Sequence, residues 1–386
     1  MRNSTFRMRR RTRSTLFIVA ILLVLLAALI YLRGKAPPEA ARLLPESDGI
    51  LYVDLAPLRL ATHFDQHPVP HDAAYQRFID ATGFVFERDL NEAAFALHRM
   101  ANPLGPNGPV AFSEVFVGHF DRKRLIAYLQ QVSQGGDQSG SQSGGQGGSQ
   151  GGSQEQYAGH TIFNLPSDGR TVRVTLLGYD MVAVSNTPTP EQIHAILDRY
   201  RTAALPFSGS SVLGQYYGEV PALSVAWGIG KISLPLSGGP RVLGLRIPIN
   251  PDTAFVASLR YLGTLKLRIE EIAPNDIEAA ATATTLRTLL GLAAAGENTL
   301  PASMANADYR QLLNSVQVEQ KGDRAVLSAT LPINLLEKIV APAAGLGPLA
   351  TPNAPTSAPP PPTEPQPSPP GRHSAHARRS SGWRNQ

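Results

Sequence analysis

A run of eighteen uncharged residues near the start constrains this chain more than any other feature. Residues 15–32 read TLFIVAILLVLLAALIYL, and thirteen of the eighteen are Leu, Ile, Val or Phe. As a helix with a rise of about 1.5 Å per residue, the run would cover roughly 27 Å, close to the thickness of a hydrocarbon core. Each of these side chains favours insertion by about 0.3–0.6 kcal/mol, so the total is roughly 4 to 8 kcal/mol. We predict a transmembrane helix over 15–32, with the lipid bilayer as its partner.

The arginines before this run set its orientation. Six arginines and no acidic residue stand in residues 1–14, whereas only Arg33 and Lys35 follow the run closely. Because positive charge is retained on the cytoplasmic side, we expect a cytoplasmic basic leader at 1–14 and a single-pass helix in a bacterial inner membrane. The main domain would then be periplasmic or otherwise extracytoplasmic. A cleaved signal peptide leads to the same compartment, but its apolar run is usually only about 7 to 15 residues long.

The distribution of charge argues against nucleic acid as a partner. The net charge of +5 divides into +8 for residues 1–35, −6 for 36–340 and +3 for 341–386. Nucleic-acid binding needs a basic face on the folded part, because phosphate neutralisation supplies most of the affinity. The chain also contains no cysteine, which excludes thiolate metal sites and cysteine nucleophiles.

Two low-complexity segments punctuate the chain. Residues 133–154 consist of Ser, Gln and Gly apart from Asp137, so they cannot bury apolar surface. We expect a disordered loop within a domain there, with a domain linker as the alternative. Residues 341–386 contain twelve prolines between Pro342 and Pro370 and should form a disordered, extended tail. That tail is either a spacer or ligand for an envelope protein or cell-wall partner, or a segment without a role of its own.

Between these segments, β-rich runs lead repeatedly through a capping signal into an amphipathic helix. The runs are 114–120, 181–186, 265–272 and 324–331, followed by Asp121, the box Thr189-Pro190-Glu191-Gln192, Asn275 and Pro332. The residues expected to face inward are Leu125, Ile126, Leu129 and Val132; Ile193, Ile196, Leu197 and Tyr200; Ile277, Leu286, Leu289 and Leu290; and Leu335, Leu336 and Ile339. Short turns at 166–170, 178–180 and 321–323 join neighbouring runs, which requires antiparallel pairing.

Hairpins combined with helices predict an α+β fold, with mainly antiparallel sheets and helices packed on one face. We divide the extracytoplasmic part into two halves, 36–205 and 206–340. Their similar order of runs makes them candidates for two diverged copies of one unit.

Three stretches carry a resemblance to a known group of proteins. They are LLPESDGILYVDLAPL (43–58), TGFVFERDLNEAAFALH (82–98) and NSVQVEQKGDRAVLSATLP (314–332). They resemble uncharacterised bacterial envelope proteins that have one N-terminal membrane helix and a repeated α+β extracytoplasmic domain. The resemblance implies an anchored domain of unknown function and supplies no catalytic residue.

The stretch HFDQHPVPH, residues 63–71, is the strongest candidate for chemistry. His63, His67 and His71 recur at four-residue intervals, which on a helix would align two imidazoles for zinc. Pro68 and Pro70 interrupt any such helix, because proline lacks the backbone donor and clashes with the preceding turn. A loop could still gather the histidines with Asp65 and Asp72, so a metal-dependent hydrolase remains an alternative to a solvated loop.

Weaker candidates do not form a recognisable site. Gly228-Ile229-Gly230-Lys231 lacks the spacing of a phosphate-binding loop, and Ser210 and Ser211 do not stand in a Gly-x-Ser-x-Gly motif. Glu270 and Glu271 should face opposite sides of a strand. His119 and His160 fit packing residues, and His373 and His376 fit a solvated basic end.

The sequence therefore predicts no catalytic, cofactor-binding or metal-ligating residue. We expect a non-catalytic, single-pass membrane-anchored protein that binds or scaffolds an unknown ligand outside the cytoplasm. The alternatives are a membrane-tethered hydrolase that uses the 63–72 His/Asp loop, and an accessory subunit of an envelope membrane complex.

Overall fold

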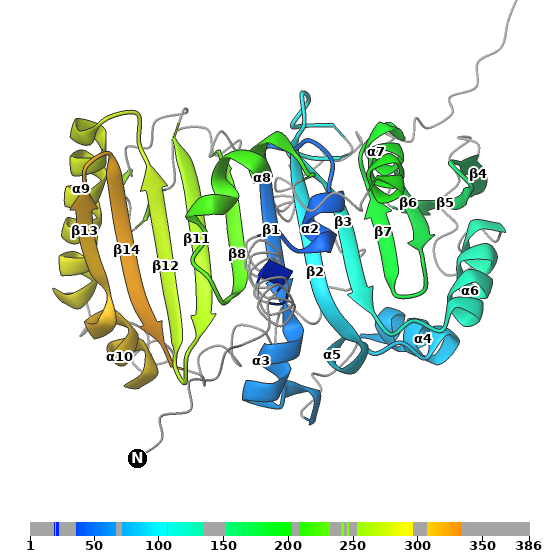
Figure 1. Ribbon diagram of the computed structural model, residues 1–386, viewed down its shortest axis with the longest axis horizontal. Helices are drawn as coiled ribbons and strands as arrows, with labels where there is room; N and C mark the ends of the chain where they lie inside the picture. Colours follow the sequence, from blue (N-terminus) through cyan, green and yellow to red (C-terminus); the bar gives the residue numbers. More distant parts are fainter. Residues whose placement is uncertain are drawn as a thin grey trace, which may run out of the picture. The chain divides into compact units, whose positions relative to one another are not determined.

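The computed structural model describes most of the chain between residues 36 and 332 (Figure 1). The described residues are 36–66, 72–105, 107–134, 152–167, 169–202, 208–231, 241–242, 245–246, 253–295 and 307–332, together with Val19, Ile21 and Leu22. All of them lie in the first of two units, Met1–Ala350. The second unit, Thr351–Gln386, lies outside the described residues.

Several sequence expectations also lie outside the described residues. They are the leader at 1–14, nearly all of the helix at 15–32, the helix expected after Pro332 and the tail at 341–386. Among the residues that are described, no helix combines the length and the apolar character needed to cross a membrane.

The described chain is built around one large antiparallel sheet. Twelve strands follow the order β13-β14-β12-β11-β8-β1-β2-β3-β7-β6-β5-β4. Their bounds are β1 Gly49–Asp54, β2 Leu90–Arg99, β3 Val110–Gly118, β4 Ser153–Tyr157, β5 His160–Ser167, β6 Arg170–Leu177, β7 Met181–Ser185, β8 Ser224–Lys231, β11 Ala254–Tyr261, β12 Leu265–Ile272, β13 Gln317–Lys321 and β14 Arg324–Leu331. The short strands β9 Arg241–Val242 and β10 Leu245–Arg246 pair only with each other. The coarse expectation of an α+β fold with antiparallel pairing is confirmed.

The two faces of the sheet are both buried, each in a core of its own. Adjacent residues of a strand point to opposite faces, and the neighbours Ala93 and Ala94 of β2 accordingly belong to different clusters. Ala94 shares its cluster with Ile193 of helix α7 (Glu191–Arg201), and Ala93 shares its cluster with Leu125 of helix α6 (Arg122–Gln134). We call these surfaces the α7 face and the α6 face.

Helices cover both faces, so the expectation of helices on one face is wrong. The helices are α2 Glu39–Leu43, α3 Leu55–Thr62, α4 Ala73–Thr82, α5 Phe86–Asp89, α6 Arg122–Gln134, α7 Glu191–Arg201, α8 Ser211–Tyr216, α9 Asp276–Ala295 and α10 Ala307–Ser315, with 3-10 turns η1 Phe64–Gln66 and η2 Tyr217–Glu219. Helices α2, α7 and α8 pack on the α7 face, while α4 and α6 pack on the α6 face. The physical reason is that the central strands carry apolar side chains on both sides, which one layer of helices cannot cover.

The sheet has an upper and a lower end, as drawn in Figure 1. At the lower end β1 finishes at Asp54 and runs into α3, while β2 begins at Leu90. At the upper end β1 begins at Gly49 and β7 finishes at Ser185. These ends matter below, because the candidate site lies at the upper end and an exposed apolar rim lies at the lower end.

The two halves of the chain repeat one order of elements. In the first half β1, β2 and β3 pair in sequence, α6 follows, and β7 returns to pair with β3. In the second half β8, β11 and β12 pair in sequence, α9 follows, and β14 returns to pair with β12. The pairing of β1 with β8 joins both halves into one continuous sheet.

The structure confirms the local hairpins and corrects two helix details. The pairs β5–β6, β6–β7 and β13–β14 are antiparallel as predicted. Helix α7 buries Ile193, Ile196 and Leu197, but no side chain caps its first turn, so the capping box is wrong. In α9 the predicted inward Ile277 is 81% exposed, and the buried positions are Ala279, Thr282, Ala283 and Leu289.

The ends of the segment 133–154 lie side by side. Ser133 and Gln134 complete α6, and Ser153 and Gln154 begin β4. A Cβ on Gly152 would lie 2.5 Å from the backbone oxygen of Ser133, so glycine is required at this close approach. Both α6 and β4 contact β5. Residues 135–151 themselves lie outside the described residues.

Candidate functional site

A row of buried polar side chains crosses the upper end of the α7 face. His98 of β2 bonds through Nε2 to Ser113 Oγ of β3 at 2.9 Å, and Ser113 Oγ lies 3.2 Å from Ser185 Oγ of β7. Ser185 Oγ in turn lies 2.9 Å from Thr187 Oγ1, which donates to the Thr189 carbonyl at 3.0 Å. Hydrogen bonds satisfy these groups where burial would otherwise be costly.

The His98 imidazole is held by the protein and is neutral near neutral pH. Besides Ser113, the ring hydrogen-bonds to the backbone carbonyl of Glu46. Burial lowers the pKa of His98, and the charge of Asp48 only partly opposes this shift. A neutral, fixed ring presents a hydrogen-bonding wall without introducing a charge.

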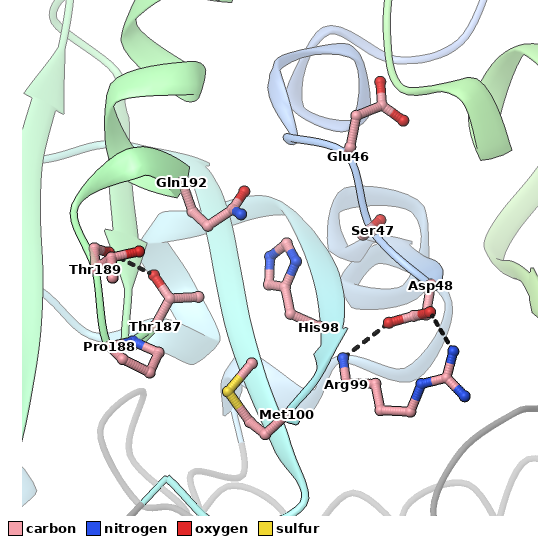
Figure 2. A pocket seen from close by; sticks show the side chains of 10 residues that line it. All are labelled: Glu46, Ser47, Asp48, His98, Arg99, Met100, Thr187, Pro188, Thr189 and Gln192. Atoms are coloured by element: carbon pink, nitrogen blue, oxygen red, sulfur yellow. Dashed lines mark hydrogen bonds and ion pairs between the residues drawn. The ribbon is translucent and has the colours of Figure 1, made fainter. Parts of the chain in front are cut away.

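An open depression of about 390 Å³ lies over this row (Figure 2). Its lining residues are Glu46, Ser47, Asp48, His98, Arg99, Met100, Thr187, Pro188, Thr189 and Gln192. Figure 2 shows the His98 ring between Gln192 and the segment that carries Ser47 and Asp48. The depression therefore offers backbone, amide and imidazole groups beside the apolar surfaces of Met100 and Pro188.

The walls of the depression are fixed by charged side chains that bond to the backbone. Asp48 accepts hydrogen bonds from the Arg99 backbone amide at 2.8 Å and from its guanidinium at 3.2 Å. On the opposite side the buried Arg173 guanidinium donates to the Thr187 carbonyl at 2.7 Å and to the Pro188 carbonyl at 3.3 Å. The loops before β1 and after β7 are thus held in place from both sides.

Glu46 connects this site to the second half of the chain. Its carboxylate accepts hydrogen bonds from the Ser211 hydroxyl at 2.7 Å, from the Ser211 amide at 2.9 Å and from Arg199 at 2.8 Å. Partial burial alone would raise the pKa of Glu46, but the bonds from Ser211 and Arg199 favour the carboxylate and lower it. Arg199 also donates to the Leu44 carbonyl at 2.6 Å.

The hydroxyl of Ser113 is paired with His98 but closed to the depression. A serine hydroxyl 2.9 Å from an imidazole has the spacing of a nucleophile and its base. However, Ser113 is 0% exposed, so no substrate can reach its oxygen from the depression. The hydroxyl row supports His98 from below, and the surface groups above it can hydrogen-bond a ligand.

The described residues of the 63–72 stretch end α3, form a 3-10 turn and begin α4. His63 is exposed and ends α3 in the left-handed conformation, with φ 52°. Asp72 is the N-cap of α4 and accepts from the Tyr75 amide at 2.7 Å, and Asp65 lies in the 3-10 turn η1. Residues 67–71 lie outside the described residues, and within the described part no three His, Asp or Glu side chains gather as a metal site would require.

The weaker sequence candidates lie in ordinary secondary structure or form hydrogen bonds and ion pairs within the fold. Glu270 and Glu271 face opposite sides of β12 as predicted: Glu270 bonds Arg268 and Arg324, whereas Glu271 accepts from Thr282 of α9 at 3.2 Å. Ser210 caps α8, and Gly228–Lys231 forms the upper part of β8. His160 Nδ1 contacts the Leu176 carbonyl at 3.1 Å, and His119 is exposed just after β3.

Sequence reasoning missed the row at His98. Its members come from separate strands, so only the pairing of β2, β3 and β7 brings them together. A signal was present, because His98, Ser113 and Ser185 each continue an alternation of small apolar residues such as Ala94, Ala96 and Ala183. A polar residue on the buried face of a strand marks such a network.

Comparisons with known proteins found distant structural matches and no family. No protein-family model matches the chain, and no curated protein matches it. Crystal form III of TP0453 matches with 11% identity and a TM-score of 0.42, over 79% of this chain and 99% of that chain. Crystal form I matches with 12% identity and a TM-score of 0.40, over 80% and 98%. At such low TM-scores and identities, no property of TP0453 is transferred to this chain.

Proposed function

We propose that this chain is a non-catalytic, single-pass membrane-anchored protein that binds or scaffolds a partner outside the cytoplasm. The uncharged run at 15–32 and the six arginines before it support an anchor with a cytoplasmic N-terminus. The resemblance of three stretches to bacterial envelope proteins supports a location at the bacterial inner membrane, with the domain on its periplasmic side.

One observation carries the binding role. The depression at the upper end combines a neutral His98 ring, held by two hydrogen bonds, with a Ser113 hydroxyl that is inaccessible. Fixed and neutral hydrogen-bonding groups lose little entropy when a ligand docks, and that favours recognition. An open site with walls fixed by Arg173 and Glu46 suits a protruding segment of a partner better than an enclosed small molecule.

A duplicated scaffold fits this role. We propose that the halves 36–205 and 206–340 are diverged copies of one unit, because their strands and helices follow one order around β1 and β8. Fusing two such units edge to edge gives a broad, rigid platform and leaves only two sheet edges. Those edges, β4 and β13, are short and polar, which discourages pairing with other chains.

Site-specific crosslinking in living cells tests the binding role. A photo-reactive residue at Gln192, in the depression, should give a defined crosslinked partner, whereas one at Lys123, exposed at the start of α6, should not. Filling the depression with Thr189→Trp should remove the Gln192 adduct at unchanged protein level. Equal adducts from both positions, or an adduct that survives the filling, would contradict the proposal.

The same crosslink tests the role of the tail. If the proline-rich segment recruits an envelope or cell-wall partner, a chain shortened to residue 340 should yield less of the Gln192 adduct. An unchanged yield would mean that the depression binds the partner without help from the tail.

A further inference from the structure

Three leucines project into solvent at the lower end of the sheet. Leu60 of α3 and Leu223 before β8 are each 77% exposed, and Leu262 in the β11–β12 turn is 53% exposed. Arg260 pairs with Ser224 across β11 and β8, which brings the residues beyond them, Leu223 and Leu262, to one edge. Figure 1 shows α3 and the β11–β12 turn at this lower end. Exposed apolar side chains on three separate elements at one end of the sheet favour a surface for a partner.

Leu223 is placed at a position that local structure disfavours. Its φ is 63°, in the left-handed region where glycine or asparagine is usual. The side chain contributes nothing to the core, since most of its surface is open to solvent. Neither backbone preference nor packing accounts for a leucine here, and a partner outside the domain would.

Two cations without a counter-charge flank the same turn. Arg260 and Lys266 stand directly opposite each other on β11 and β12. Like charges in this position repel, and neither side chain has an ion pair among the described residues. An anion between them would relieve the repulsion. The combination of apolar tips and adjacent cations matches a lipid surface, with acyl chains beneath anionic headgroups.

The chain enters the described domain on the α7 face, near the middle of β8. Tyr217 donates to the Ala36 carbonyl at 3.5 Å, on the α7 face beside Trp227. Burial raises the pKa of Glu92 near the start of β2, and the charges of Asp54 and Glu39 add to this shift. Three residues separate Leu32 from Ala36, and the four steps between them span at most about 14 Å. A helix that ends at Leu32 in the membrane would therefore keep Ala36 within about 14 Å of the bilayer.

We propose that the lower end of the sheet docks on the anionic lipid surface of the membrane that anchors the chain. Leu60, Leu223 and Leu262 enter the headgroup region, and Arg260 and Lys266 bind lipid phosphates. This inference rests on the proposed membrane anchor. It orients the domain so that the depression at the upper end faces away from the membrane, toward partners.

Fluorescence quenching by lipids tests the docking in the full-length chain. The chain has no cysteine, so single cysteines can be introduced and labelled with an environment-sensitive fluorophore. Leu262→Cys probes the rim, Leu104→Cys probes the 98% exposed loop at the upper end, and Leu25→Cys probes the proposed anchor. Each variant is reconstituted into phosphatidylethanolamine and phosphatidylglycerol vesicles that carry nitroxide-labelled lipids. We expect quenching at positions 25 and 262 to exceed that at 104 several-fold.

A charge variant tests the role of the cations. Arg260→Gln with Lys266→Gln should reduce quenching at position 262 at least twofold, and the matched change Lys231→Gln at the upper end of β8 should not. Thermal unfolding of each variant verifies that the fold is intact.

The outcomes separate the docking from the anchor. Quenching at 25 but not at 262 overturns the docking and leaves the anchor standing. Quenching at 262 but not at 25 overturns the anchor and supports lipid docking by the rim alone. If 262 is shielded only in native membranes and never in pure lipid vesicles, the rim binds a protein and the lipid proposal is wrong.

Discussion

At the scale of single residues, Glu114 is a side chain whose ionisation depends strongly on its surroundings. It lies on the α6 face of β3, paired with Phe95 and Val184, and its Oε2 is buried without a hydrogen-bond partner among the described residues. Burial raises the pKa of Glu114 to about 8. The carboxyl is therefore protonated in the folded chain at pH values where it is ionised in the unfolded chain.

This difference predicts a loss of stability as the pH rises. The folded state holds a proton that the unfolded state releases, so the free energy of unfolding should fall by on the order of 3 kcal/mol between about pH 5 and 8. Glu114→Gln should remove most of that slope in thermal or urea unfolding. The control Glu319→Gln, on the exposed strand β13, should retain it. Parallel slopes for Glu114→Gln and the natural chain would show that Glu114 ionises freely.

The candidate site could be foreseen only in part at this scale. His98, Ser113 and Ser185 fall at strand positions where the alternating pattern otherwise places apolar residues. Their burial could therefore be predicted from the sequence. Their contact could not, because it depends on the pairing of β2 with β3 and of β3 with β7. The HFDQHPVPH stretch drew attention through histidine spacing alone. In the structure, its flanking Asp72 serves to cap α4.

At the scale of elements, the caps of α6 and α9 fix where each helix begins. Asp121 accepts from the Lys123 and Arg124 amides, and Asn275 accepts from the Ile277 and Glu278 amides at 3.1 and 3.0 Å. Each cap stands three residues after the end of a strand, β3 or β12, and so helps to set how the chain leaves the sheet.

Removal of a cap should cost a measurable part of the stability. Asn275→Ala leaves two amides without their acceptor and should lower the free energy of unfolding by about 1 kcal/mol. Asn314→Ala, at an exposed position in the last turn of α10, should change it little. Equal effects of the two substitutions in urea unfolding would mean that the Asn275 bonds contribute no stability.

Local signals explain why the elements were easier to predict than their placement. Tight turns at 178–180 and 321–323 require antiparallel pairs, and the structure has them. The buried face of helix α9 was harder to predict, because its many alanines and threonines do not form a clear apolar stripe. Ala279, Thr282 and Ala283 turn inward where small residues allow close packing, and this turns Ile277 outward. Contacts with the rest of the fold, and not the local sequence pattern, determine which face of α9 is buried.

At the scale of the whole molecule, one sheet runs through both halves. The β1–β8 pairing and the Glu46 bonds to Ser211 tie the first half to the second. The order of strands and helices along the chain could be predicted. The joining of two units into one sheet could not, because no local sequence signal shows which strand edges pair. The presence of apolar side chains on both faces of β2 was the available sign that one helical layer would not suffice.

We propose that this sheet lies outside the cytoplasm, held by a helix at 15–32. The most direct test uses full-length chain with Leu104→Cys, since position 104 is 98% exposed in the β2–β3 loop and the natural chain has no cysteine. Bacterial spheroplasts are treated with a membrane-impermeant maleimide before and after lysis. The account predicts complete labelling before lysis, whereas labelling that begins only after lysis would place the domain in the cytoplasm and contradict it.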